Sequence, residues 1–138
     1  MKKNILLYLT PKSETFYLLA NSTIRQALEK FDFHKFSVVP LIDKNGKYYG
    51  TISEGDILRY IKNECDFDIH TAEKQQLSKI EKYRSYKAIS INASMDDVLK
   101  LAIEQNFIPI KDDLDNYIGI IKRKDIIKDA IENKLYEI

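Results

Sequence analysis

The 138-residue sequence has no tryptophan, one cysteine, two histidines, three prolines and four glycines. A single cysteine cannot form an intramolecular disulfide, and two isolated histidines do not make a metal-ligand cluster. The scattered glycines match neither a phosphate-binding P-loop nor a Rossmann fingerprint, and no nucleophile-elbow motif occurs. The sequence therefore predicts no metal site, no catalytic residues and no enzymatic activity.

Net charge and hydrophobic runs are equally limited. The net charge of +1 gives no strong attraction for nucleic acid or for an anionic membrane. The apolar run at residues 5–9 is too short for a membrane span or a signal-peptide core. With 44% hydrophobic and 31% charged residues, the chain is expected to be a globular cytoplasmic protein without nucleic-acid or membrane partners. We expect the single thiol, Cys65, to be buried on an apolar helix face.

The first half of the chain carries a clear pattern of strands and helices. A short helix is expected at residues 4–9, where Pro11 stops it. Apolar runs, cap residues and an Asn-Gly turn then predict a β-α-β-β-α unit. Its expected strands cover residues 15–20, 36–42 and 47–52, and its expected helices cover residues 23–33 and 53–65.

The same order of elements recurs in the second half. Strands are expected at residues 88–91, 107–110 and 117–121, and helices at residues 94–105 and 124–135. Because Pro40 and Pro109 fall at matching places in the two patterns, the chain contains an internal duplication. Pro40 lacks an N–H group, so we expect it at a sheet edge, a bulge or a strand start. The predicted organisation is repeat 1 at residues 9–65, a polar connector at 66–82 and repeat 2 at 83–135.

Apolar residues at helical spacing predict which face of each helix is buried. The charged residues of the same helices are expected to face solvent. The expected inward-facing residues are Ile24, Ala27, Leu28 and Phe31 in the first helix, Ile57, Leu58, Ile61 and Cys65 in the second, Met95, Val98, Leu99, Ala102 and Ile103 in the third, and Ile127, Ala130, Ile131 and Leu135 in the last.

Two polar residues stand where the last strand of repeat 1 runs into its last helix. Ser53 occupies an N-cap position, and Asp56 three residues later can complete a capping box. The same helix start directs N–H groups and a positive dipole end outward, which suits a phosphate. In repeat 2 the serine is replaced by Lys122, which is a poor cap. That second junction is either degraded or specialised for a more anionic ligand, with Arg123 and Lys124 adding positive charge.

These junctions resemble the CBS domain, in which an apolar-Pro-apolar strand and a turn precede a Gly-x-x-Ser-x-x-Asp segment. Here that segment is Gly50 to Asp56. Two such units in one chain resemble a CBS pair, or Bateman module, over residues 9–135. Residues 11–14 with 25–29, and 105–109 with 119–121, are similar to the small stand-alone CBS-pair proteins of Gram-positive bacteria.

The resemblance implies an α/β (α+β) fold of two β-α-β-β-α repeats related by a pseudo-two-fold axis. It further implies a regulatory sensor without a prosthetic group. In this family the clefts bind AMP, ADP, ATP, S-adenosylmethionine or, in some small Gram-positive members, cyclic di-AMP. Such pairs commonly form homodimers, and an adenine nucleotide would control their affinity for an unidentified target protein.

The residues that match the family's ligand-binding positions form two sets. Ser53 and Asp56 match positions that contact ribose and phosphate. The complete first set is Lys12, Ser13, Thr15, Ser37, Val38, Val39, Pro40, Ser53 and Asp56, and the second is Phe107, Ile108, Pro109, Lys122, Arg123 and Asp125. Two plainer alternatives stay open: the serine and aspartate form only a capping box, or the chain is a ligand-independent interaction module with vestigial clefts.

Overall fold

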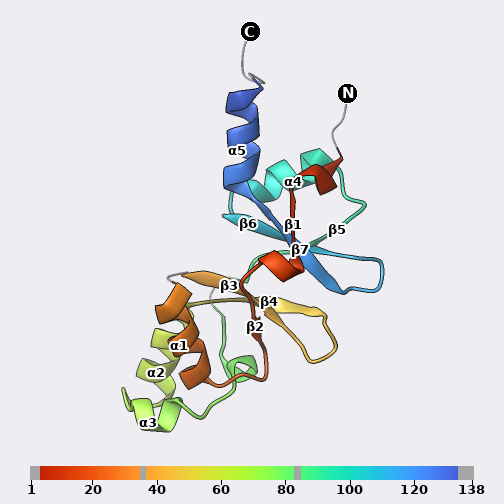
Figure 1. Ribbon diagram of the computed structural model, residues 1–138. Helices are drawn as coiled ribbons and strands as arrows, with labels where there is room; N and C mark the ends of the chain where they lie inside the picture. Colours follow the sequence, from red (N-terminus) through yellow and green to blue (C-terminus); the bar gives the residue numbers. More distant parts are fainter. Residues whose placement is uncertain (1–3, 35–36, 83–84, 134–138) are drawn as a thin grey trace. The chain divides into compact units, whose positions relative to one another are not determined.

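A computed structural model of the chain describes residues 4–34, 37–82 and 85–133 (Figure 1). The chain forms two compact units, one made of Met1–Thr15 with Tyr86–Ile138 and the other of Phe16–Ser85. We call them the terminal unit and the central unit and describe each by itself. Each contains one sheet with helices, so the predicted α/β class is confirmed.

The central unit contains the first β-α-β-β-α set of elements. Its sheet has the order β2-β3-β4, with β2 parallel to β3 and β4 antiparallel to it. The predicted tight turn joins β3 to β4, and Gly46 in this turn has a φ of 83°. The elements, each of which overlaps its predicted segment, are β2 (Leu18–Leu19), α1 (Ile24–His34), β3 (Val38–Ile42), β4 (Tyr48–Ser53) and α2 (Glu54–Glu64).

One hydrophobic core holds this unit together. Helix α1 contributes Ile24 and Phe31, helix α2 contributes Ile57, and β3 and β4 supply the facing aliphatic side chains. Cys65, just after α2, is buried in the same cluster with a free thiol, as predicted. Removing these apolar side chains from water supplies the main stabilisation of the unit.

The segment predicted as a connector is part of the central unit. It forms the short helix α3 (Ile69–Ala72) and the 3₁₀ helix η3 (Leu77–Lys79). Leu77 and Ile80 are buried in the core, and the Leu77 N–H donates to the carbonyl of Ser22 at 2.8 Å. Residues 66–82 therefore pack against the first repeat, which their polar composition did not indicate.

The terminal unit contains the second set of elements together with the N-terminal segment. Its sheet has the order β1-β7-β6-β5. The predicted N-terminal helix is a 3₁₀ helix, and a strand that the sequence did not predict follows it. The elements are η1 (Ile5–Tyr8), β1 (Leu9–Pro11), the 3₁₀ helix η2 (Lys12–Glu14), β5 (Ile89–Ser90), α4 (Met95–Ala102), β6 (Phe107–Lys111), β7 (Tyr117–Lys122) and α5 (Arg123–Glu132).

Strand β1 pairs antiparallel with β7, more than 100 residues away in the sequence, with Leu9 opposite Ile121. Gly119 makes this pairing possible. A Cβ at Gly119 would lie 2.1 Å from the carbonyl oxygen of Thr10, and the residue has a φ of 150°. Because only glycine lacks the Cβ atom, it permits the close approach of the two backbones.

Both prolines lie inside strands that are central in their sheets, away from a strand start and from the register shift, in contrast to the prediction for Pro40. Pro40 is in β3 and Pro109 is in β6. However, β2 pairs only with Leu41 and Ile42, one residue beyond Pro40, and β5 is placed in the same way beyond Pro109. At each proline the strand has one paired neighbour in its sheet, so a missing N–H group is tolerated there.

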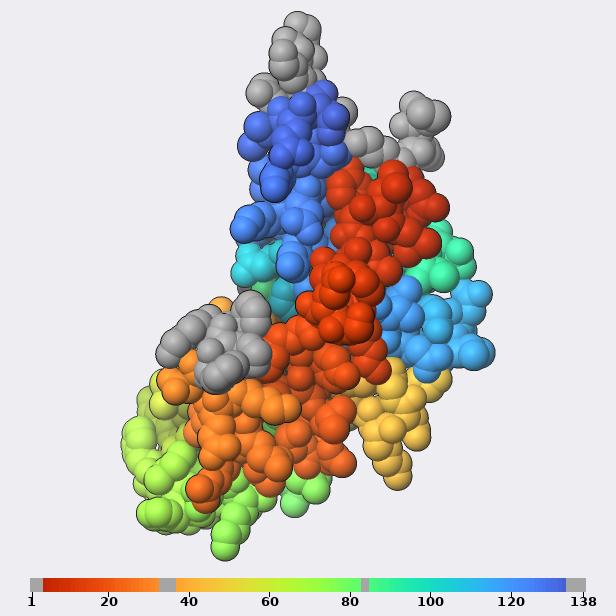
Figure 2. Space-filling model, viewed as in Figure 1, coloured from red at the N-terminus to blue at the C-terminus, as the bar shows by residue number. Residues whose placement is uncertain are grey.

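Five large aliphatic side chains predicted to face inward are instead exposed. They are 43% to 74% exposed and comprise Leu58 on α2, Leu99 on α4, Ile103 just after α4, and Ile127 and Ile131 on α5. Helix α4 ends at Ala102, before Ile103. The inward positions of Ile57, Val98 and Ala102 are confirmed, and Leu135 lies outside the described residues. Helix α5, coloured blue, forms part of the surface seen in Figure 2.

Candidate functional site

The junction between β4 and α2 is built around a capping box. Ser53 ends β4 with an extended backbone, and its Oγ accepts a hydrogen bond from the N–H of Asp56 at 3.1 Å. In return, Oδ2 of Asp56 accepts from the N–H of Ser53 at 2.9 Å. The simpler of the two sequence interpretations is therefore present, and it fixes the position of the Asp56 carboxylate at the first turn of the helix.

The Asp56 carboxylate is buried, with 2% of its surface exposed, and it faces a guanidinium group. Nη2 of Arg59 donates to Oδ1 of Asp56 at 2.5 Å, and the Arg59 side chain is 47% exposed. A buried carboxylate needs such a partner because an uncompensated buried charge is strongly unfavourable. The sequence interpretation missed Arg59, although the Asp-x-x-Arg spacing on a helix was a usable signal.

The start of β3 lies directly beside this junction. Val38 pairs with Ser53 across the two antiparallel strands, and the N–H of Glu54 donates to the carbonyl of Ser37 at 3.1 Å. Val39 and Pro40 are buried, whereas Ser37 is exposed. The structure therefore brings together six of the nine residues predicted for the first site: Ser37, Val38, Val39, Pro40, Ser53 and Asp56.

The other three predicted residues of the first site belong to the terminal unit. Lys12 and Ser13 lie in η2, and Thr15 follows it. The hydroxyl of Thr15 donates to the carbonyl of Lys12 at 2.8 Å and accepts from the hydroxyl of Tyr117 at 2.9 Å. These contacts hold the short segment in place within its own unit.

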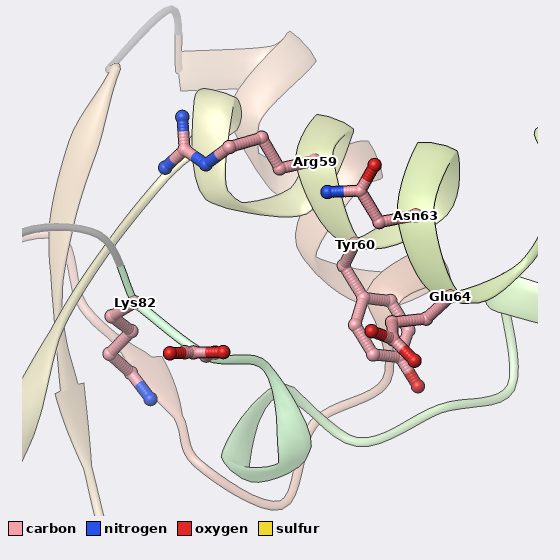
Figure 3. A pocket seen from close by; sticks show the side chains of 6 residues that line it. Arg59, Tyr60, Asn63, Glu64 and Lys82 are labelled. Carbon is pink, nitrogen blue, oxygen red and sulfur yellow. The ribbon is translucent and has the colours of Figure 1, made fainter.

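A pocket of about 320 Å³ opens beside α2 in the central unit (Figure 3). Arg59 and Asn63 project from successive turns of α2, while Tyr60 and Glu64 lie together at the opposite end of the pocket. Lys82, in the segment after η3, forms part of another wall. The pocket thus joins cations and carboxylates, with Glu81 supplying the second carboxylate.

Lys82 is a half-buried cation that the sequence interpretation also missed. Its Nζ lies 4.9 Å from the centre of the Tyr49 ring and donates to the carbonyl of Ile80 at 3.3 Å. Burial lowers the pKa of Lys82, and the negative charge of Asp56 partly opposes this shift. The segment is fixed further by Ser85, whose hydroxyl accepts from the N–H of Thr51 at 3.1 Å.

The corresponding junction of the terminal unit has the same backbone arrangement. Phe107 pairs with Lys122, and the N–H of Arg123 donates to the carbonyl of Asn106 at 3.0 Å. Phe107, Ile108 and Pro109 are buried in β6. All six residues predicted for the second site therefore lie on β6, β7 or the start of α5.

The side chains at this second junction differ from those at the first. Lys122 is the N-cap residue of α5 and makes no side-chain cap, as predicted. The Arg123 guanidinium donates to the carbonyl of Ala102 at 3.0 Å and to the side chain of Asn106, which ties α5 to the end of α4. Asp125 is half-buried, whereas Asp56 is buried. The start of α5 carries the positive charges of Lys122 and Arg123, in place of the buried Asp56–Arg59 ion pair of the first junction.

Comparison with known proteins identifies the duplicated unit. The family model for the CBS domain matches residues 4–63 and 82–132. The chain belongs to the CBS domain family. The first matched segment contains the β4–α2 junction and the second contains the β7–α5 junction, so each CBS repeat supplies one of the two candidate sites.

Solved CBS proteins share the fold. CbpB in complex with c-di-AMP is 24% identical with a TM-score of 0.86, covering 98% of this chain and 88% of that one. CbpB from Streptococcus agalactiae is 25% identical with a TM-score of 0.81, covering 94% of this chain and 80% of that one. CBSX2 in complex with AMP is 21% identical with a TM-score of 0.72, covering 95% and 98%. These likenesses confirm the predicted fold of two CBS repeats.

The helix starts of the two CBS junctions can bind polar, anionic ligands through their N–H groups. Each junction offers a helix start beside a strand, and the first adds a carboxylate and a guanidinium. Across residues 4–34, 37–82 and 85–133, no three histidine, cysteine or acidic side chains are placed to hold a metal ion. Within the same ranges, no helix has the length and apolar character needed to cross a membrane.

Proposed function

We propose that this CBS protein is a non-catalytic cytoplasmic regulator that binds an adenine nucleotide and passes its bound state to a target protein. The observation that carries the proposal is the buried Asp56 carboxylate at the start of α2, held between Ser53 and Arg59. Related CBS structures with c-di-AMP or AMP support the choice of ligand class. The proposed function requires no prosthetic group.

In the first site, Asp56 accepts hydrogen bonds from ribose hydroxyls, because a carboxylate makes strong charge-assisted bonds. Ser53 and the N–H groups of the α2 start bind phosphate. The remaining residues of the proposed first site are Lys12, Ser13, Thr15, Ser37, Val38, Val39 and Pro40, which contact the base and sugar. The proposed second site consists of Phe107, Ile108, Pro109, Lys122, Arg123 and Asp125 and takes the more anionic ligand.

The chemistry of Asp56 favours a mononucleotide at the first site. AMP, ADP and ATP carry two neighbouring ribose hydroxyls, whereas each 3′ oxygen of cyclic di-AMP is part of a phosphodiester. A carboxylate with two oxygens matches the pair of hydroxyls.

Ligand binding regulates by favouring one conformation over another, so the target protein must distinguish the two. We also propose a homodimer. The exposed aliphatic residues Ile127 and Ile131 line a groove of about 620 Å³ together with Lys124 and Lys128. Exposed apolar surface bordered by charge is typical of protein interfaces.

A second candidate function is a ligand-independent interaction module. Two observations favour it: both oxygens of Asp56 already accept hydrogen bonds within the chain, and α5 exposes aliphatic side chains. In that case the junction serves only to start α2 and hold it to the sheet.

A thermal-shift screen with AMP, ADP, ATP, cyclic di-AMP and S-adenosylmethionine separates the two functions. A ligand at 100 times its dissociation constant stabilises the folded state by about 2.7 kcal/mol, which raises the midpoint by several degrees. Asp56→Ala should abolish the response that arises from the first site. Asp97→Ala is the matched control, because Ser94 and Asp97 form the same capping box at the start of α4. No shift with any ligand would leave the interaction module as the function.

A further inference from the structure

The loop between α2 and α3 exposes an aromatic ring on a strained backbone (Figure 1). Asp66 and Phe67 have φ angles of 49° and 64°, and Phe67 is 68% exposed. A positive φ is tolerated by aspartate but is unfavourable for a bulky side chain. The N–H of Phe67 donates to the carbonyl of Ile61 at 3.0 Å, which holds the turn. Asparagine or glycine would make this turn without strain, so folding of the chain alone does not account for the phenylalanine.

The residues around this ring are acidic or apolar. We call four consecutive exposed residues the tip, namely Asp66, Phe67, Asp68 and Ile69. Glu64, two residues before the tip, is also exposed, and no basic residue lies between it and Ile69. The tip therefore presents apolar surface bordered by negative charge, which is typical of a protein interface.

The groove along α5, which we call the α5 groove, has the opposite charge. It has a volume of about 620 Å³ and is lined by the exposed side chains of Ile127 and Ile131. Its charged residues are three cations and one carboxylate, namely Arg123, Lys124, Lys128 and Glu132. Two α5 grooves that faced each other would bring mainly like charges together, which is unfavourable. The tip instead supplies opposite charge and an aromatic ring for the isoleucines.

We propose that the tip of one copy of this chain docks in the α5 groove of a second copy. Phe67 lies between Ile127 and Ile131, and the aspartates of the tip face the lysines of the groove. This inference rests on the proposed homodimer and states which surfaces form it. In a dimer of two-fold symmetry the contact occurs twice, because each copy offers one tip and one groove. Burial of the ring drives the association, and the opposite charges orient it.

Sedimentation velocity of the full chain, combined with thermal unfolding, tests the docking through Phe67→Asn. Asparagine accepts a positive φ, so the unfolding midpoint should stay equal or rise, while self-association weakens about tenfold or more. A structural role for the ring would lower the midpoint instead. Phe67→Gly also fits this backbone and should behave alike. Leu114→Asn is the matched control, because Leu114 is 71% exposed in a turn, and it should leave association unchanged.

Mixing two damaged copies distinguishes tip-to-groove docking from a contact between two α5 helices. Phe67→Asn leaves the groove intact, and Ile131→Glu leaves the tip intact. Neither variant alone can form an undamaged contact, whereas a mixed dimer forms one, so an equimolar mixture should associate more strongly than either variant.

Two results would overturn the inference while leaving α5 as the dimer interface. One is wild-type association of Phe67→Asn together with weakened association of Ile131→Glu, and the other is the absence of any gain on mixing. A wild type that stays monomeric would refute the proposed homodimer, and the inference with it.

Discussion

The replacement Asp56→Ala tests how strongly the buried junction of the first CBS repeat contributes to folding. The change removes the acceptor for the N–H of Ser53 and leaves Arg59 without its 2.5 Å contact. Loss of the hydrogen bond from the N–H of Ser53 to the carboxylate costs about 1 kcal/mol, while the Ser53 cap itself remains. Loss of the ion pair adds at most about 1 kcal/mol, because the half-exposed arginine regains water. The free energy of unfolding should therefore fall by about 1–2 kcal/mol.

The control for this measurement is Asp97→Ala. Its carboxylate makes the same bonds with Ser94 but is exposed, and it carries no arginine partner in the described contacts. Urea denaturation of both variants should give unchanged m-values and a larger loss of stability for Asp56→Ala. If Asp97→Ala costs as much or more, burial and the Arg59 contact add nothing, and the account of the junction is incorrect.

Three other predictions concern the terminal unit. Gly119→Ala places a Cβ against the backbone of β1 and should lower the unfolding free energy by about 1–3 kcal/mol in the same assay; an unchanged midpoint would contradict the observed pairing. Hydrogen bonds from Ser94 lower the pKa of Asp97 below its usual 3.8, so its contribution is present above that pH and is lost as the pH falls through the lowered folded value. Asp97→Asn should remove this part of the acid dependence of thermal unfolding, and an identical profile would argue against it. Ile131→Glu should weaken self-association in sedimentation velocity, whereas Leu114→Glu, at a similarly exposed turn residue, should not; equal effects would argue against α5 as the interface.

Local patterns in the sequence predict most of the fold. The strand–helix order of both repeats follows from apolar spacing, turn residues and the matching prolines. The capping residue Ser53 and the uncapped Lys122 follow from helix-start chemistry alone. These features depend on neighbours within a few residues, which is why one sequence is enough to predict them.

The features that escaped prediction depend on distant contacts. Strand β1 is only three residues long and forms because β7 offers an edge beside Gly119. The packing of Leu77 and Ile80 into the first repeat likewise requires the finished core. Helical spacing also placed Ile127 and Ile131 inward, because it identifies an apolar face without saying whether the same chain covers it.

The candidate site was predicted in part. Six residues of the first set meet at the β3–β4–α2 junction. Arg59 and Lys82 were not predicted from the sequence and were identified as site residues only from the structure. Arg59 follows its partner on the same helix, so a search for acid–arginine pairs would have found it. Lys82 reaches Tyr49 through tertiary folding, and no local pattern marks it.

Nuclear magnetic resonance titration of the ¹⁵N-labelled chain with AMP tests the central claim most directly, because it locates binding without any substitution. The account predicts saturable shifts of the backbone amides of Ser53, Asp56 and Arg59, together with Ser37 to Val39. Absence of shifts with every adenine nucleotide, or saturable shifts confined to residues outside both junctions, would contradict the claim that this CBS protein senses a nucleotide at the start of α2.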